Sequence, residues 1–189
     1  DNNWLSPDEV EKVNGKIVKK IDENKIVKVG PSESMSKSKK NVIDPEFIIK
    51  NYGADAVRLF ILSDSPPEKD VQWSEQGMVS SYKFVQKLWI LHNEIKNIIF
   101  NNKYEKDDKQ IEKFVNQMIS KITVNLEKFN YNVIIANMYE TYNFLSLFIK
   151  EKNNIKNLKD NYKKLLTCFL PIIPHFANEC LYELCSDKK

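Results

Sequence analysis

Apolar and polar residues alternate with different periods on the two sides of Ser74. After Ser74, apolar residues recur at three- and four-residue steps, which places them on one face of an α-helix. The pattern predicts a long helix to about residue 100 and four more helices, with breaks at 101–108, Asn130, 150–156 and Pro171. The predicted apolar stripes are Met78, Tyr82, Val85 and Trp89, with Leu88 as a further candidate; Ile111, Val115, Met118, Ile122 and Leu126; Ile134, Ile135, Met138, Tyr142, Leu145 and Phe148; Leu158, Tyr162, Leu165, Leu166 and Phe169; and Phe176, Leu181 and Leu184. Each stripe needs a covering partner, so an antiparallel helical bundle is expected.

Before Ser74, the predicted elements are shorter than the helices that follow and are separated by more turn residues. Residues 16–21 and 25–29 carry β-branched side chains typical of strands, with a turn at Asn14-Gly15 and another at 22–24. Residues 30–41 are polar and predict an exposed loop. Asp44-Pro45 opens a short helix that ends at Gly53, and a second short helix occupies 54–62. The fold class is therefore mainly α, an antiparallel helical bundle preceded by a small β-containing region.

Composition excludes several classes of protein. The chain has 189 residues, of which 42% are hydrophobic, so a packed core is expected. No apolar run reaches the roughly 20 residues that cross a bilayer, and residues 1–7 lack the features of a signal peptide. We expect a cytoplasmic protein without membrane contact. The chain begins without Met, which predicts a piece of a longer protein.

The cysteines do not suggest a metal or a disulfide framework. Cys168, Cys180 and Cys185 are odd in number and late in the chain. A zinc site with His175 would need ligands at five-residue steps, which lie about 140° apart on a helix of about 3.6 residues per turn. We expect no metal site, and thiols that are buried and structural.

The side chains best suited to a chemical role lie in the polar loop, from Ser34 to Ser38. A lysine flanked by small hydroxyl residues on a loop can fold over a polyphosphate, where its ammonium offsets negative charge and hydroxyls donate hydrogen bonds. Lysine-rich surface loops are common, so residue types alone favour an ordinary solvated loop.

A family resemblance makes this loop specific. The stretch Met35 to Ser38 and the adjoining 39–45 resemble the second signature of class I aminoacyl-tRNA synthetases, Lys-Met-Ser-Lys-Ser. Residues 52–58 are similar to the segment that lies after this signature in the family. The stretch 65–74 resembles the leucyl enzymes in particular, and 171–179 resembles the Pro-x-x-Pro-His segment of the anticodon-binding bundle. The resemblance runs from about Trp4 to Leu184 and is strongest over 34–74.

The resemblance implies roles for individual residues. Lys37 is implied as the catalytic lysine that contacts the ATP phosphates, within an ATP-binding set of Ser34, Met35, Ser36, Lys37 and Ser38. Ser34 departs from the motif, which has its first Lys there, so either Lys39 or Lys40 compensates or ATP is held more weakly. The implied substrates are leucine, ATP with Mg²⁺, and leucine tRNA, and the implied protein is a monomer.

Much of the implied enzyme is missing from the chain. His92 and His175 are the only histidines, and neither lies in His-x-Gly-His, the other class I signature. The leucine pocket and editing residues are absent, so we expect this piece alone to be inactive. We divide it into 1–33, a remnant of the catalytic region; 34–73, the signature loop and connecting helices; and 74–189, an anticodon-binding bundle that is incomplete at its C-terminus.

Nucleic-acid contacts are less well defined. The net charge is +3, and Arg58 is the only arginine among 29 basic side chains, so lysine is enriched throughout. Four lysines lie at three- and four-residue steps and form a candidate tRNA-contacting face, although a solvated face is an equal interpretation. They are Lys152, Lys156, Lys159 and Lys163. An ion pair is expected between Arg58 and Asp55. The alternatives are an isoleucyl, valyl or methionyl enzyme, or a non-catalytic RNA-binding helical module.

Overall fold

The computed structural model describes residues 3–63, 66–101, 107–151 and 155–185. The chain divides into two compact units, Asp1–Lys50 and Asn51–Lys189. Within the described ranges, strands occur in the first unit and the second is built from helices. None of the described helices combines the length and the apolarity needed to cross a membrane.

The first unit contains a three-stranded antiparallel sheet in the order β1-β2-β3. The strands are β1 (Val10–Val13), β2 (Lys16–Lys19) and β3 (Asp22–Ile26), preceded by a 3₁₀ turn, η1 (Pro7–Glu9). Asn14 and Gly15 join β1 to β2 with φ angles of 50° and 82°. Two successive positive φ angles are what a tight hairpin turn requires and what Asn-Gly supplies. The turn predicted at these residues is therefore confirmed.

The second hairpin differs from the prediction. Lys19 pairs with Asp22, so the turn consists of Lys20 and Ile21, and residues 22–24 belong to β3 rather than to the turn. A two-residue connection already reverses the chain, which leaves Asp22 free to pair. Ile21 at the turn is almost fully exposed. The strand Val10–Val13 was not predicted, because its alternation is too short to stand out.

Two short helices come next, α1 (Pro45–Tyr52) and α2 (Ala54–Ser63). Asp44 caps α1 by accepting the backbone N–H of Glu46 at 3.0 Å. Gly53 separates the helices with φ at 80°, a left-handed conformation that ends α1 and strongly favours glycine. Both helices were predicted with nearly these bounds.

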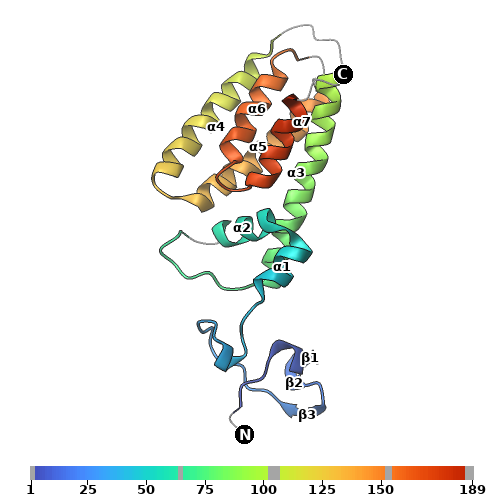
Figure 1. Cartoon of the computed structure of the whole chain (residues 1–189), viewed down its shortest axis with the longest axis vertical. Helices are drawn as coiled ribbons and strands as arrows, with labels where there is room; N and C mark the ends of the chain where they lie inside the picture. The colour runs from blue at the N-terminus through green and yellow to red at the C-terminus, as the bar shows by residue number, and fades with distance from the viewer. Residues whose placement is uncertain (1–2, 64–65, 102–106, 152–154, 186–189) are drawn as a thin grey trace. The chain divides into compact units, whose positions relative to one another are not determined.

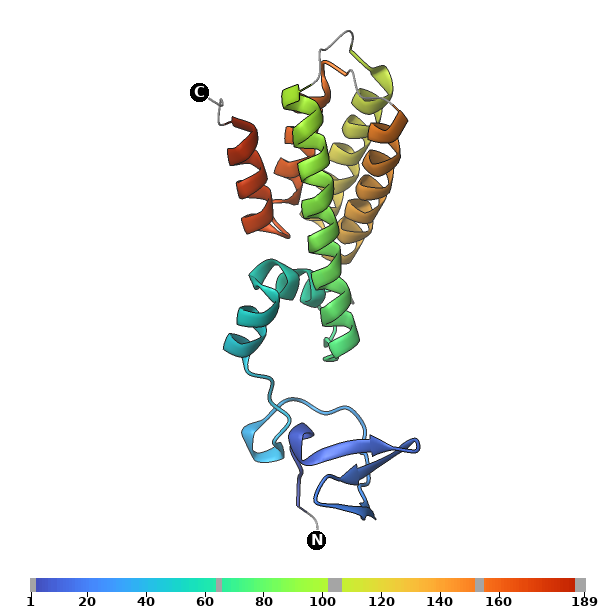
Figure 2. The same cartoon turned by 90° about the vertical axis from the view of Figure 1, so that its right-hand side faces the viewer.

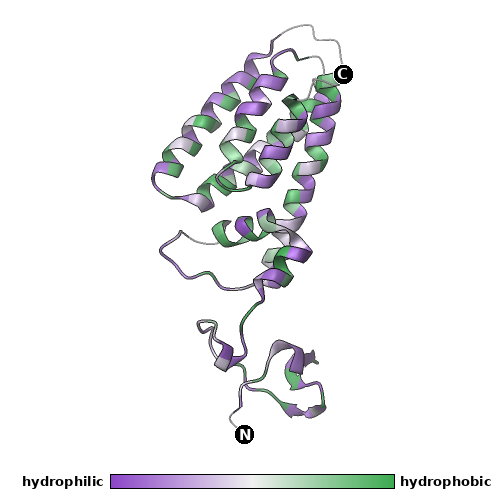
Figure 3. Ribbon diagram, in the orientation of Figure 1, coloured by the Kyte–Doolittle hydropathy of each residue, from purple (hydrophilic) through white to green (hydrophobic). Residues whose placement is uncertain are grey.

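The helical bundle comprises α3 (Glu75–Asn101), α4 (Lys109–Glu127), α5 (Tyr131–Glu151), α6 (Leu158–Phe169) and α7 (Pro174–Cys185). Helix α4 packs against α5 and α6, while α3 packs against α5 and α7 (Figures 1 and 2). Successive helices run in opposite directions, and hydrophilic residues alternate with hydrophobic ones along each (Figure 3). The mainly α fold class, with a bundle preceded by a small sheet, is confirmed.

The bundle core is apolar and contiguous across all five helices. The start of α4 is capped by Asp108, whose carboxylate accepts the N–H groups of Gln110 at 2.7 Å and Ile111 at 3.2 Å. Residues with no measurable exposure include Ile95, Ile111, Met118, Ile134, Met138, Leu158, Leu165 and Leu166. The stripes predicted on α4, α5 and α6 thus largely face the core.

The face predicted for α3 is right in part, since Met78 and Leu88 are buried while Tyr82 and Val85 are only half-buried. Its buried residues are Met78, Ser81, Phe84, Leu88, Leu91, His92, Ile95 and Ile99. Trp89 is 39% exposed rather than a core residue. Apolar side chains lie on both sides of this helix, so periodicity alone does not identify which side is covered.

The connection into α3 is fixed by aromatic packing. The Trp73 ring meets the Phe60 ring of α2 edge-on, with centroids 5.3 Å apart. Gly77 lies where a Cβ would come within 2.8 Å of the Phe60 ring. Ser74 caps α3 by accepting the Gly77 N–H at 3.1 Å. The long helix therefore begins after Ser74 as predicted, and the Trp73 ring ties this start to α2.

Candidate functional site

The polar loop adopts a defined local structure between Ser34 and Asn41. Ser36 has an extended backbone and begins a 3₁₀ turn, η2 (Lys37–Lys39). Lys40 then takes a left-handed conformation, with φ at 52° and ψ at 31°, and its N–H donates to the Lys37 carbonyl at 3.2 Å. The chain therefore doubles back immediately after the predicted catalytic lysine.

The returning chain places Asn41 across the loop. The Asn41 side-chain oxygen accepts the Ser36 backbone N–H at 2.7 Å, and its Nδ2 donates to the Ser34 carbonyl at 3.4 Å. The hydroxyls of Ser36 and Ser38 lie 3.2 Å apart. One amide thus bonds to backbone on both sides of Met35, and Asn41 is a residue of the loop that sequence reasoning missed.

Two of the three loop lysines are paired with carboxylates. Lys39 Nζ forms an ion pair with Glu33, and Lys40 Nζ lies 3.2 Å from Glu9 Oε2. Glu9 also accepts from the Ser6 backbone N–H at 2.8 Å and from the Ser6 hydroxyl at 2.7 Å. The Ser6 backbone and hydroxyl donors, together with Lys40, lower the pKa of Glu9 to about 2, so it stays ionised.

Lys37 is the lysine of the loop that is available to a ligand. It is exposed, and among the described residues no hydrogen bond or ion pair engages its ammonium group. Ser34, where the related motif has a lysine, is exposed as well. The loop therefore presents one uncompensated ammonium, flanked by the hydroxyls of Ser36 and Ser38.

A second polar cluster joins α2 to the start of α7. Asp55 is buried, and its carboxylate accepts the N–H of Phe176 at 2.6 Å, the N–H of His175 at 3.3 Å, and lies 2.9 Å from His175 Nδ1. Arg58 donates to the carbonyls of Pro171 at 2.7 Å and Ile172 at 3.0 Å. Both residues bond to the 171–176 turn, and no ion pair joins Asp55 with Arg58 within the described residues. The predicted ion pair between Arg58 and Asp55 is wrong. Backbone N–H groups at the start of α7 bond to Asp55, and backbone carbonyls just before α7 bond to Arg58.

A third cluster fixes the other end of α7. His92 is buried in α3, with Nδ1 3.1 Å from the Tyr162 hydroxyl and Nε2 2.8 Å from Glu183 Oε2. Lys96 Nζ lies 2.7 Å from the same Glu183 oxygen. Burial lowers the pKa of His92, while the Lys96 hydrogen bond is the main cause that lowers the pKa of Glu183. The imidazole is held neutral beside an ionised carboxylate, which is typical of a structural role.

The prediction of buried thiols is confirmed for Cys180 and is wrong for Cys185. Cys180 is fully buried and burial raises the pKa of its thiol, while Cys168 is half-buried and Cys185 is exposed. Among the described residues, no group of three or more His, Cys, Asp or Glu side chains is placed to hold a metal ion.

The candidate tRNA-contacting lysines are only partly described. Lys152 lies outside the described residues. Lys156 is exposed in the turn before α6, whereas Lys159 and Lys163 are half-buried on α6. The Lys159 ammonium lies 5.5 Å from the centre of the Phe100 ring, a cation–π contact. The three described lysines thus share one end and one side of α6, and their role stays a prediction.

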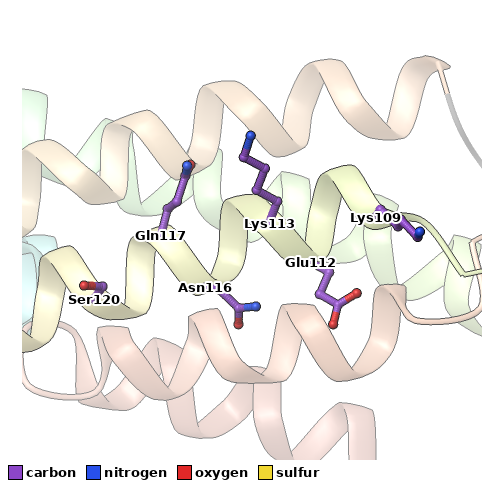
Figure 4. A pocket seen from close by; sticks show the side chains of 6 residues that line it. All are labelled: Lys109, Glu112, Lys113, Asn116, Gln117 and Ser120. Carbon is purple, nitrogen blue, oxygen red and sulfur yellow. The ribbon is translucent and has the colours of Figure 1, made fainter.

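A shallow depression lies on the solvent-facing side of α4 (Figure 4). Its lining is polar and of mixed charge, with no paired groups converging on a point. The lining residues are Lys109, Glu112, Lys113, Asn116, Gln117 and Ser120. It has the character of a solvated helix face.

Two family models match the chain. Residues 17–74 match the model described as tRNA synthetases class I (I, L, M and V), and residues 108–189 match the anticodon-binding domain of tRNA ligase. The first match contains the whole loop from Ser34 to Asn41, and the second covers most of the bundle.

Several curated proteins are similar over nearly the full chain. The leucine–tRNA ligase of Bartonella quintana is 38% identical over 95% of this chain and 22% of its own length. The leucine–tRNA ligase of Orientia tsutsugamushi is 42% identical over 94% of this chain and 21% of its own. The chain therefore spans about one fifth of the length of the curated relatives that it matches.

A solved structure shares the fold. The LeuRS of Agrobacterium radiobacter K84, in its ternary complex with tRNA and LeuAMS, superposes with a TM-score of 0.71 at 21% identity. The match covers 82% of this chain and 21% of that one. At this identity the likeness establishes the fold alone.

Proposed function

We propose, from its similarity to leucine–tRNA ligases and to two models of class I tRNA ligases, that this chain supplies the ATP-phosphate loop and the tRNA-binding bundle of a longer leucine–tRNA ligase. The whole enzyme would join leucine to its tRNA in the cytoplasm, as a monomer, with ATP converted to AMP and pyrophosphate. This piece would be inactive by itself, because it has no leucine pocket or His-x-Gly-His segment.

Lys37 is proposed as the catalytic residue of this piece. In the first half-reaction a leucine carboxylate oxygen attacks the α-phosphate of ATP, and the bond to the β-phosphate breaks so that pyrophosphate leaves with the electron pair. ATP enters such a reaction as its Mg²⁺ complex, so the metal arrives with the substrate. The Lys37 ammonium would stabilise the charge that develops on the leaving pyrophosphate.

The observation that carries this proposal is the difference between the three loop lysines. Lys39 and Lys40 are paired with Glu33 and Glu9, whereas the Lys37 ammonium has no partner among the described residues. An ammonium already neutralised by a carboxylate attracts a phosphate less than a free one does. Ser34, Met35, Ser36 and Ser38 would line the ATP side of the loop, with hydroxyls and backbone N–H groups as hydrogen-bond donors.

The bundle is proposed to bind the tRNA backbone. Lys156, Lys159 and Lys163 lie at one end of α6, and Lys152 precedes them in the sequence. Ammonium groups that meet phosphates release condensed counter-ions, so the contact would be salt-dependent and would carry little base specificity.

The test uses the full-length ligase and amino-acid-dependent ATP–pyrophosphate exchange. Leucine, and not isoleucine, valine or methionine, should support exchange. Lys37→Ala should lower the exchange rate roughly 10²–10³-fold, the loss expected when one transition-state charge contact is removed. Lys87→Ala, an exposed lysine of α3, is the matched control and should leave exchange unchanged. Wild-type exchange by Lys37→Ala would remove this lysine from the mechanism.

A further inference from the structure

The side chain of Asn41 makes the main brace across the proposed phosphate loop. Its amide accepts the Ser36 N–H at 2.7 Å and donates to the Ser34 carbonyl at 3.4 Å. Asparagine presents an acceptor and a donor on one planar group. Aspartate at this position lacks the donor, and leucine, which has the same branching, lacks both.

The backbone brings Asn41 into this position. Lys40 has φ at 52°, a conformation that reverses the chain and that a lysine adopts only when its surroundings impose it. The reversal brings Asn41 back to the start of η2, next to Ser36, the residue that directly precedes this turn. Within the turn, the Ser36 carbonyl accepts the Lys39 N–H at 3.2 Å and the Ser36 hydroxyl lies 3.2 Å from that of Ser38. The bond from the Ser36 N–H to Asn41 is what ties this residue to the returning chain.

Lys37 comes directly after Ser36 and is the first residue of η2. The orientation of the Ser36 backbone therefore sets the direction in which the Lys37 side chain leaves the loop. The other restraints on the loop are the ion pairs Lys39–Glu33 and Lys40–Glu9, whose side chains are about one third to one half exposed. Exposed ion pairs stabilise a conformation only slightly. The partly buried amide bond is the stronger restraint.

We propose that Asn41 is a positioning residue of the reaction, which holds Ser36 so that the Lys37 ammonium is aimed at the ATP phosphates. This inference rests on the proposed function of Lys37. Asn41 does not contact the substrate in this assignment, so its effect on rate passes through Lys37. A misplacement of about 1 Å in a catalytic group lowers rates by as much as 10²-fold.

The experiment is a double-mutant cycle in the full-length ligase, read by leucine-dependent ATP–pyrophosphate exchange. The variants are Asn41→Leu, Lys37→Ala and the pair together. Asn41→Leu keeps the number and branching of the side-chain heavy atoms and should lower exchange about 10- to 100-fold, with an unchanged KM for leucine. In the Lys37→Ala background the same change should lower exchange less than about 3-fold, because residues that act as a unit are not additive.

Controls separate positioning from misfolding. Asn178→Leu, at an exposed position of α7, should leave exchange unchanged, and thermal unfolding of Asn41→Leu should match that of the wild type. Wild-type exchange by Asn41→Leu, or an equal loss in both backgrounds, would overturn the inference while leaving Lys37 catalytic. If Lys37→Ala alone had no effect, the proposed function of the loop would fail instead, and Asn41 could not act through it.

Discussion

Asp55 is the residue whose removal should most weaken the attachment of α2 to the bundle. Its carboxylate is 7% exposed and accepts three hydrogen bonds from the start of α7, two from backbone N–H groups and one from the His175 ring. The first N–H groups of any helix lack partners within the helix and need a cap. Asp55 provides this cap from 120 residues away.

The loss can be worked from these contacts. Removing a capping carboxylate costs about 0.5–2 kcal/mol. The Phe176 N–H would also be left buried without a partner, which costs about 1–3 kcal/mol. Because the two effects partly overlap, Asp55→Ala should lower the free energy of unfolding by about 2–4 kcal/mol. Asp55→Asn keeps an acceptor oxygen and should lose about half as much.

Urea unfolding followed by circular dichroism measures this loss, since nearly all helix lies in the second unit. With a urea slope of about 2 kcal/mol per molar, the midpoint should fall by about 1–2 M while the slope stays the same. Asp70→Ala, an exposed aspartate in the connection before α3, is the matched control and should shift the midpoint little. Equal midpoints for Asp55→Ala and Asp70→Ala would refute the assignment of Asp55 as the cap of α7.

Three further predictions concern the loop, the buried histidine and the lysines. Ser34→Lys in the full-length enzyme should leave the KM for ATP unchanged or lower it, because a second free ammonium would face the phosphates; a large loss of exchange would show that the loop is built around Ser34. Burial depresses the pKa of His92 in the folded state, so the unfolded chain binds a proton that the folded chain does not. The free energy of unfolding should therefore fall as pH drops below the ordinary pKa of 6.5. Urea titrations at several pH values measure this dependence, and His92→Gln should flatten it. The isolated chain should bind tRNA near the non-specific range of roughly 10⁻⁴–10⁻⁶ M and weaken steeply with salt; tight, salt-insensitive and selective binding in a titration with leucine tRNA and an unrelated tRNA would contradict this.

The helices of this protein could be predicted because their causes are local. The 158–169 helix has its predicted bounds, set by an apolar stripe and a terminating proline two residues on. The same reasoning left Leu88 and Trp89 of α3 as competing candidates, because both are large apolar side chains and only the partner helices decide that Leu88 is the buried one. Periodicity predicts that a face exists and leaves open which neighbours cover it.

The loop could be predicted in part for the same reason. Ser34 to Ser38 are consecutive, so their resemblance to a phosphate-binding signature is visible in the sequence. The pairing of Lys40 with Glu9 spans 31 residues, and nothing local to either residue indicates it. Asn41 was visible as the residue after the lysines, but its function depends on the left-handed turn at Lys40, which a lysine does not predict.

The two ends of α7 show why polar contacts, rather than apolar area, fix its position. Apolar side chains such as Phe176, Ala177 and Leu184 would pack almost as well after a small rotation or slide. The contact of Asp55 with two successive N–H groups, and that of Glu183 with His92 and Lys96, tolerate no such shift. A displaced α7 would leave a buried carboxylate or imidazole without its partner, which is more unfavourable than a small loss of apolar contact. Because Asp55 lies near the start of α2, these contacts fasten that short helix to the last helix of the chain.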